Sequence, residues 1–416
     1  MSFFAICAES QPSSSDANGV NDNTIDLRTE TFPYYSEHFH DLRQYITDVR
    51  KQLYLNPKPH REYLPNLGSQ EFSDAARSLC FGPENPILQD EHRLLGIQTI
   101  GGYGAIVVAT HFIKNNLKLS RVYVPLPTWE EHIGILERNG LEVCAMTWRT
   151  RDEAERGECR LIKEAKLMPK HSAVLLQASC HNPTGQNLTK AEWQQLLDIF
   201  EENEVLPLFD LAYQGLGRSL SDDAWPIREF AKRGKEFLVA QSFSANFYLF
   251  DESLGHVIAG MAPNHPDSQK TFQNLHSAFS RIVQVKWANP AFFGCRLVTE
   301  VLTNPSLLES WKNALKSVRM KLQKERNKMI TGLEADEIAS KSEGIYVVLN
   351  LNESQILKLQ TDFNILMDPN GSINMTCLNN KNRTRFYNAV NAVTVTDTKD
   401  KGKQHEDDVP LILSYI

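Results

Sequence analysis

Residues 205–215 read VLPLFDLAYQG, and this stretch decides the fold class. Its first six residues form a short apolar run that ends in Asp210, which is the pattern of a strand buried on both faces. Four further runs of the same kind occur along the chain, at 121–125, 173–176, 237–243 and 256–259. Buried strands of this type predict a mostly parallel sheet.

Helical patterns separate these runs. Residues 189–204 place apolar side chains at helical spacing, and Thr189 with Glu192 forms a capping box at the start. A second helix is expected to open at Asn304, with Pro305 in its first turn. Strand–helix alternation indicates an α/β fold, in which ligands bind at the carboxyl ends of the strands.

Composition narrows the function classes. The chain has 416 residues and a net charge of −7, which disfavours a broad nucleic-acid-binding face. Seven cysteines without a CxxC pair argue against a disulfide framework or a zinc site and favour a reducing compartment. There is no apolar run of membrane-spanning length, and no Lys or Arg precedes Arg28, so we expect a cytoplasmic protein without a membrane segment.

Three polar clusters follow predicted strands. They read HNPTG at 181–185, FDLAYQG at 209–215 and QSFSANF at 241–247. Taken singly, each has a plain interpretation: Asn-Pro and Thr-Gly mark turns, a strand-terminal Asp is usually a turn or cap residue, and a lone Trp or Tyr usually belongs to the core.

In this order and spacing, the three clusters resemble the fold-type I pyridoxal-phosphate enzymes, and the aspartate aminotransferase family in particular. The resemblance runs from residue 25 to 392 and includes shorter pieces at 61–65, 127–132, 223–225 and 287–290. It implies a large domain with a seven-stranded, mostly parallel sheet and a smaller α+β domain, assembled as a homodimer. It also implies a cis peptide between Asn182 and Pro183.

The domain boundaries are expectations from the same resemblance. Residues 1–43 form a flexible leader and the N-terminal part of the small domain, and 44–317 form the large domain. Residues 318–393 complete the small domain, and 394–416 form a charged, disordered tail.

The resemblance further implies a pyridoxal 5'-phosphate site. Asp210 would bind the protonated pyridine nitrogen, with His132 behind it. Asn182 and Tyr213 would hydrogen-bond the phenolic oxygen, and Trp129 would stack on the ring. The remaining cofactor positions that the family assigns are Gly102, Ser242 and, reaching the phosphate in the neighbouring subunit, Tyr63.

Several residues depart from the family's pattern. Ala245 stands where the family has its Schiff-base lysine, which holds the cofactor and moves the proton. Ser253 replaces the phosphate-binding arginine, while Ser372 and Gln284 replace the two arginines that bind substrate carboxylates. Lys286 is the one candidate for a replacement cation near Gln284, although an exposed or structural lysine is the simpler interpretation.

These losses predict weak cofactor binding. The phosphate would lose one arginine and, in the GGYG turn at 101–104, two hydroxyl donors. At about 1.5–3 kcal/mol per charge-assisted hydrogen bond, the cost is roughly 4–8 kcal/mol, or about 10³–10⁶ in affinity.

We therefore predict a degenerate aspartate aminotransferase-like protein that binds a ligand, such as a dicarboxylic amino acid or oxo acid, or a partner without transaminating. Two alternatives remain. One is an active pyridoxal-phosphate-dependent aspartate:2-oxoglutarate aminotransferase that uses another base. The other is a non-catalytic dimer partner of an active relative.

Overall fold

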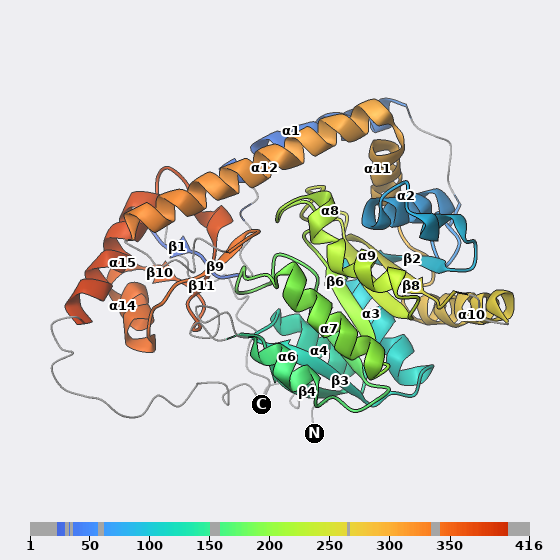
Figure 1. Ribbon diagram of the computed structural model, residues 1–416. Helices are drawn as coiled ribbons and strands as arrows, with labels where there is room; N and C mark the ends of the chain where they lie inside the picture. The colour runs from blue at the N-terminus through green and yellow to red at the C-terminus, as the bar shows by residue number, and fades with distance from the viewer. Residues whose placement is uncertain are drawn as a thin grey trace, which may run out of the picture.

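The computed structural model describes residues 23–29, 33, 36–56, 62–149, 159–263, 267–333 and 342–397. At its centre is a seven-stranded sheet with the order β2-β8-β7-β6-β5-β3-β4 (Figure 1). Only β8 runs antiparallel to both of its neighbours, which confirms the predicted mostly parallel sheet. The strands are β2 (Leu94–Ile100), β3 (Arg121–Leu126), β4 (Glu142–Thr147), β5 (Ala173–Gln177), β6 (Leu206–Leu211), β7 (Phe237–Ser242) and β8 (Leu254–Gly260).

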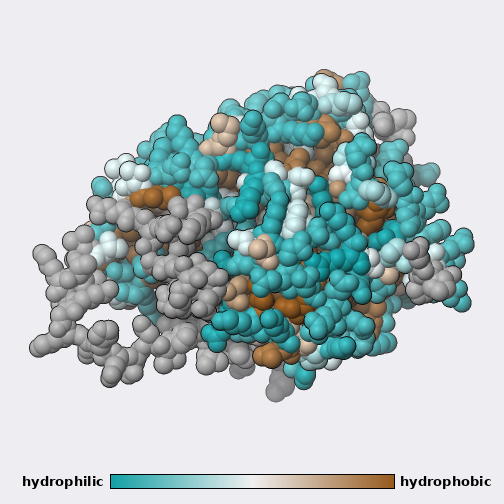
Figure 2. Space-filling view, in the orientation of Figure 1, coloured by the Kyte–Doolittle hydropathy of each residue, from teal (hydrophilic) through white to brown (hydrophobic). Residues whose placement is uncertain are grey.

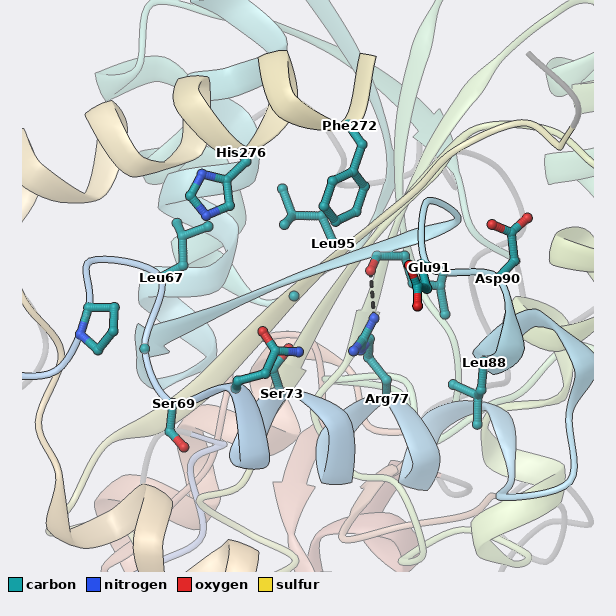
Figure 3. Close-up of a pocket in the computed structure, with 15 residues that line it drawn as sticks. Leu67, Ser69, Ser73, Arg77, Leu88, Asp90, Glu91, Leu95, Phe272 and His276 are labelled. Atoms are coloured by element: carbon teal, nitrogen blue, oxygen red, sulfur yellow. Dashed lines mark hydrogen bonds between the residues drawn. The ribbon is translucent and has the colours of Figure 1, made fainter. Parts of the chain in front are cut away.

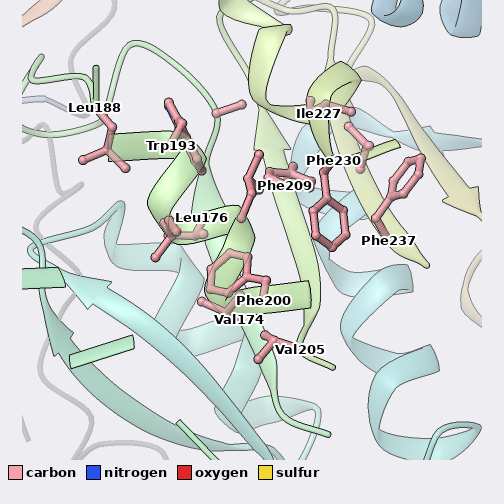
Figure 4. Packing of buried hydrophobic residues seen from close by; sticks show 14 of the residues in the cluster. Val174, Leu176, Leu188, Trp193, Phe200, Val205, Phe209, Ile227, Phe230 and Phe237 are labelled. Atoms are coloured by element: carbon pink, nitrogen blue, oxygen red, sulfur yellow. The ribbon is translucent and has the colours of Figure 1, made fainter. Parts of the chain in front are cut away.

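Helices cover both faces of this sheet. On one face lie α6 (Arg160–Ala165), α7 (Lys190–Glu202) and α9 (Trp225–Lys232), and on the other lie α3 (Gly101–Asn115), α4 (Glu130–Arg138) and α10 (Ser268–Lys286). Successive residues of β6 alternate between the two cores, since Leu208 packs with α3 and Phe209 packs with Trp193 and Phe230 (Figure 4). Asp210 is therefore held by a strand that is anchored on both sides.

A third apolar core joins the first part of the chain to its later helices. It contains residues of α1 (His40–Leu55), α2 (Gln70–Phe81), α11 (Phe293–Thr303) and α12 (Pro305–Gly332). At 28 residues, α12 is about 42 Å long, and it runs beside α1 from the sheet to the C-terminal part (Figure 1). The Tyr45 hydroxyl, which donates to the Leu307 carbonyl at 2.8 Å, ties the two helices together.

The C-terminal part has its own core and two small sheets. Strand β1 (Ile25–Asp26) pairs in parallel with β10 (Ile365–Leu366), and β9 (Tyr346–Val348) pairs with β11 (Ser372–Asn374). Helices α14 (Glu353–Phe363) and α15 (Arg383–Asp397) pack on them. The first and the last described segments thus meet in one α+β unit. The exact domain boundaries stay a prediction.

Shorter elements complete the fold. They are η2 (Glu37–Phe39), η3 (Pro86–Gln89), α8 (Leu220–Asp223) and η4 (Met375–Cys377). Figure 2 shows a largely hydrophilic face on which hydrophobic residues appear in small, separate areas. Among the described helices, none combines the length and the apolar character that a bilayer span requires.

The local signals in the sequence are confirmed with small shifts. The capping box of Thr189 and Glu192 starts α7, and Asn304 caps α12 with its side chain. The Asn182–Pro183 peptide is cis, as is Leu126–Pro127. Helix α15 continues to Asp397, so it runs four residues into the segment predicted as a tail, whereas 398–416 and most of the predicted leader lie outside the described residues.

Candidate cofactor and substrate site

Asp210, near the carboxyl end of β6, lies beside His132 of α4, the helix that follows β3. His132, near the start of α4, is fully buried, and its Nε2 lies 3.2 Å from Oδ2 of Asp210. Its Nδ1 lies 2.8 Å from the Thr128 hydroxyl, which fixes the ring between the two groups. No lysine or arginine contacts the Asp210 carboxylate in the described part of the chain. The sequence prediction that His132 supports Asp210 thus agrees with this geometry.

The 181–185 turn is held beside Asp210 by Gln177. Residues Gln177 and Asp210 are paired across β5 and β6. The Gln177 side chain donates to the Asn182 carbonyl at 2.7 Å and accepts from the Asn182 amide at 2.8 Å. Sequence reasoning missed this role, because a glutamine at a strand end carries no motif of its own.

Tyr213 lies next to Asn182, but its hydroxyl is already paired. The hydroxyl oxygens of Tyr213 and Tyr346 are 3.0 Å apart, and the Thr29 carbonyl lies 3.3 Å from the Tyr346 hydroxyl as an alternative acceptor of its proton. Burial raises the pKa of Tyr213 to about 12, and hydrogen bonds from Tyr346 and Asn182 oppose that rise. No motif in the sequence pointed to Tyr346, which is 133 residues away from Tyr213.

Two aromatic rings flank this cluster. The Trp129 ring meets the His132 ring edge-on at 5.2 Å, and the Tyr103 ring meets Trp129 edge-on at 6.3 Å. Tyr103 is 47 % exposed. The residues predicted to lie around a ring-shaped ligand are therefore close together, with Tyr103 as an additional neighbour.

The N-terminus of α3 lies against β7 and β8. A Cβ atom on Gly102 would come within 2.8 Å of the Ser242 Cβ, and Gly101 lies next to Ser253. Among the residues that the structure describes, the Ser253 hydroxyl donates only to the Phe250 carbonyl, at 3.5 Å. None of these residues has a lysine or arginine as a hydrogen-bond partner within the described ranges. The glycine turn, Ser242 and Ser253 are thus assembled without a cation.

Ala245 is buried in an apolar core. It is 3 % exposed and belongs to the cluster that contains Phe243 and Phe247. Among the described residues, none of the lysine side chains is buried. A substitute amine beside Asp210 is therefore not provided by a buried lysine of the described segments.

The other two substituted positions, Gln284 and Ser372, present no positive charge. The Gln284 side chain accepts from Asn66 at 2.7 Å, and Lys286 lies exposed with its Nζ 3.5 Å from the Asn139 side chain. Ser372 is fully buried in β11, and its hydroxyl has no hydrogen-bond partner among the described residues. Tyr63 is 89 % exposed, so none of the described residues of its own chain covers it.

A family model described as "Aminotransferase class I and II" matches residues 23–393. The chain belongs to the class I and II aminotransferases. Tyrosine aminotransferase of Klebsiella pneumoniae is 32 % identical over 349 residues, covering 82 % of this chain and 86 % of that protein. The cytoplasmic aspartate aminotransferase of Gallus gallus is 32 % identical over 343 residues, covering 78 % and 80 %.

Solved structures show the same relationship for this aminotransferase-family chain. The aromatic-amino-acid aminotransferase of Burkholderia pseudomallei, covalently bound to pyridoxal phosphate, superposes with a TM-score of 0.85 at 26 % identity. That match covers 94 % of this chain and all of the other. The predicted family, fold type and family cofactor are therefore confirmed.

The residues present fit pyridoxal phosphate only in part. Asp210, Asn182 and Trp129 form the side that the family resemblance assigns to the ring. The anchoring side does not fit, because Ala245 offers no nitrogen and Ser253 no positive charge.

Proposed function

We propose that this aminotransferase-family protein is a cytoplasmic homodimer that does not transaminate and acts by binding a ligand or a partner. The observation that carries the proposal is Ala245, a buried methyl group where the family resemblance expects the Schiff-base lysine. A methyl group can neither bond to a carbonyl carbon nor move a proton. A positioned base is typically worth about 10²–10⁴ in rate.

The other substitutions point in the same direction. Gln284 is neutral and engaged with Asn66, and the Ser372 hydroxyl is enclosed. Two carboxylate-binding arginines therefore have no counterpart at these positions, which weakens selectivity for dicarboxylates. If a dicarboxylic amino acid or oxo acid is the ligand, it binds more weakly than in a relative that has both arginines.

The dimer is supported by exposed apolar side chains at, or next in sequence to, the predicted site positions. They are Tyr63 at 89 %, Val285 at 68 %, and Ile100 and Tyr103, both at 47 %. Exposed apolar surface favours association. Light scattering on the purified chain would give a mass near twice 47.3 kDa, and a monomer at micromolar concentration would contradict the dimer.

The cytoplasmic assignment rests on cysteine usage and on a relative. All six cysteines of the described residues are free, which suits a reducing compartment. The Gallus gallus relative carries the word cytoplasmic in its name.

The decisive experiment combines absorbance with turnover. The full chain is incubated with pyridoxal phosphate, and spectra are taken before and after addition of aspartate and 2-oxoglutarate. We expect no bound cofactor band that shifts with aspartate, and no turnover. A shifting band with cofactor-dependent turnover would overturn the proposal and establish the alternative, an active aspartate:2-oxoglutarate aminotransferase, which the retained Asp210, Asn182 and Tyr213 favour.

A second candidate function is that of a non-catalytic partner of an active relative. The exposed Tyr63 favours it, because its side chain is free to reach another subunit. Co-expression with an active relative should then give a mixed dimer with lowered affinity for dicarboxylates. Separate elution of the two chains, with unchanged kinetics, would exclude this role.

A further inference from the structure

A cavity of about 380 Å³ lies between α2, β2 and α10 (Figure 3). Its apolar wall is built by Leu67, Leu88, Leu95 and Phe272. It opens beside the first half of β2, whereas the Asp210 cluster lies at the far ends of β5 and β6. The volume is within the usual range for ligand pockets, roughly 300–1,000 Å³.

The cavity exposes an unpaired piece of sheet edge. Strand β2 is the last strand on its side of the sheet. The carbonyl of Leu94 accepts from Arg77 at 2.6 Å, and the amide of Gln98 donates to the Leu67 carbonyl at 2.8 Å. Residues two apart point their backbone groups the same way, so the N–H and C=O of Gly96 also face this open edge.

Gly96 leaves these groups uncovered. Neither its N–H nor its C=O has a hydrogen-bond partner outside β2 and β8 among the described residues. A Cβ at this position would overlap the Ser73 hydroxyl, at 1.7 Å, and crowd His256, at 2.6 Å. The packing of Ser73 and His256 against the strand therefore requires glycine at this position. A glycine in a strand also allows another backbone to approach closely.

The charges around the cavity are mainly negative. Asp90 and Glu91 stand together at one end (Figure 3), and the one arginine of the lining, Arg77, is already paired with Asp74. His276, on α10, stands at the opposite end. A basic group on a bound molecule would therefore be attracted to the end formed by Asp90 and Glu91.

We propose that this cavity binds an extended peptide segment of a partner protein, in which apolar residues alternate with lysine or arginine. The segment pairs its backbone with Gly96, places apolar side chains against Leu88 and Phe272, and directs a basic side chain to Glu91. Addition of a strand to a free sheet edge is a recurring mode of peptide recognition, in which backbone hydrogen bonds supply affinity and side-chain pockets supply selectivity. The site goes beyond the proposed function and does not depend on it.

Fluorescence polarisation with synthetic peptides tests the site on the full chain. The probe is a labelled, end-blocked hexapeptide of alternating leucine and lysine, and the matched peptide carries glutamate in place of lysine. Two further probes are N-methylated at the odd or at the even residues. We expect the lysine peptide to bind at least tenfold more tightly than the glutamate peptide, and one of the two methylated peptides to lose binding at least tenfold.

Variants locate the binding in the cavity. His276→Trp narrows the opening from an exposed helix position, and Gln273→Trp, one turn earlier and outside the lining, is the matched control. Glu91→Lys reverses the charge at the acidic end. We expect His276→Trp and Glu91→Lys to weaken the lysine peptide at least tenfold, and Gln273→Trp to change it less than twofold.

Three outcomes would overturn the proposal. The first is unchanged affinity of the lysine peptide for His276→Trp. The second is equal binding of the parent peptide and of both methylated peptides. Either result would mean that the lysine peptide binds only by non-specific attraction to a chain with a net charge of −7. The third is a shift from dimer to monomer in His276→Trp, which would show that a second copy of the chain covers the cavity.

Discussion

Replacing Ala245 by lysine tests separately whether the missing amine accounts for the loss of cofactor attachment and for the loss of catalytic activity. The side chain is 3 % exposed among Phe243 and Phe247, so a lysine ammonium placed here loses most of its hydration. Burial of a charge in such a place costs several kcal/mol after relaxation, and burial also lowers the lysine pKa. We expect Ala245→Lys to reduce the free energy of unfolding by about 2–5 kcal/mol, and Ala245→Met, which adds similar length without charge, by about 1–3 kcal/mol.

The Ala245→Lys variant should bind pyridoxal phosphate but should not reach the full aminotransferase activity of a relative. It supplies a nitrogen for covalent attachment, so an absorbance band should appear on addition of pyridoxal phosphate, and the cofactor should raise the stability of Ala245→Lys and not of Ala245→Met. Gln284 and Ser372 still supply no positive charge. At about 1.5–3 kcal/mol each, two missing charge-assisted contacts amount to about 3–6 kcal/mol, or roughly 10²–10⁴ in kcat/KM for aspartate.

The measurement is urea unfolding with and without cofactor, together with kcat/KM for aspartate. The cytoplasmic aspartate aminotransferase of Gallus gallus, assayed in parallel, is the reference. A value for Ala245→Lys within tenfold of that reference would refute the reasoning, because it would mean that the other substitutions matter little.

Three more predictions concern stability and titration. Burial lowers the pKa of His256 to about 3, so as the pH falls this histidine is protonated in the unfolded chain before it is protonated in the folded chain. The free energy of unfolding should therefore drop between pH 6 and 5. His256→Gln should remove about 1 kcal/mol of that drop. Glu325 is buried and pairs with Arg383, so Glu325→Gln should cost about 3–5 kcal/mol in urea unfolding. Tyr346→Phe removes a hydrogen bond that lowers the pKa of Tyr213, so the ultraviolet titration of Tyr213 should move to higher pH.

Exposed residues provide the matched controls. His171→Gln, at an exposed position beside Glu204, is the control substitution for the first prediction. Glu309→Gln, which alters an exposed pair with Lys312, should cost less than about 1 kcal/mol. Equal losses in Glu309→Gln and in the buried-carboxylate variant would contradict the argument, as would an unchanged tyrosine titration after removal of the Tyr346 hydroxyl.

Much of the fold could be predicted because its signals are local. An uninterrupted apolar run was enough to predict each of five strands, which are β3, β5, β6, β7 and β8. The capping box at Thr189 could be recognised from two side chains three residues apart. Placement of Asp210 at a strand end followed from the same local pattern. The family resemblance then supplied the assignment of His132 behind Asp210, which agrees with the observed 3.2 Å contact.

The rest of the site depends on contacts between distant segments. The Gln177 side chain makes two hydrogen bonds with the Asn182 backbone because β5 ends beside the turn that contains the cis peptide. A single glutamine in the sequence does not predict these hydrogen bonds. The hydrogen bonding of the Tyr213 hydroxyl likewise depends on Tyr346, which lies in β9, after α12 in the chain.

By itself, the amino-acid sequence determined the α/β class, the family and the chemical losses at Ala245, Ser253, Gln284 and Ser372, since the identity of a side chain sets which bonds it can form. Only the tertiary structure decided what surrounds those positions. It placed the Tyr346 hydroxyl beside that of Tyr213, buried the Ser372 hydroxyl without a hydrogen-bond partner among the described residues, and left the Gly96 backbone open beside a cavity. The physical reason is that hydrogen-bond partners and solvent exposure depend on which segments meet in space, and that information is spread over the whole chain.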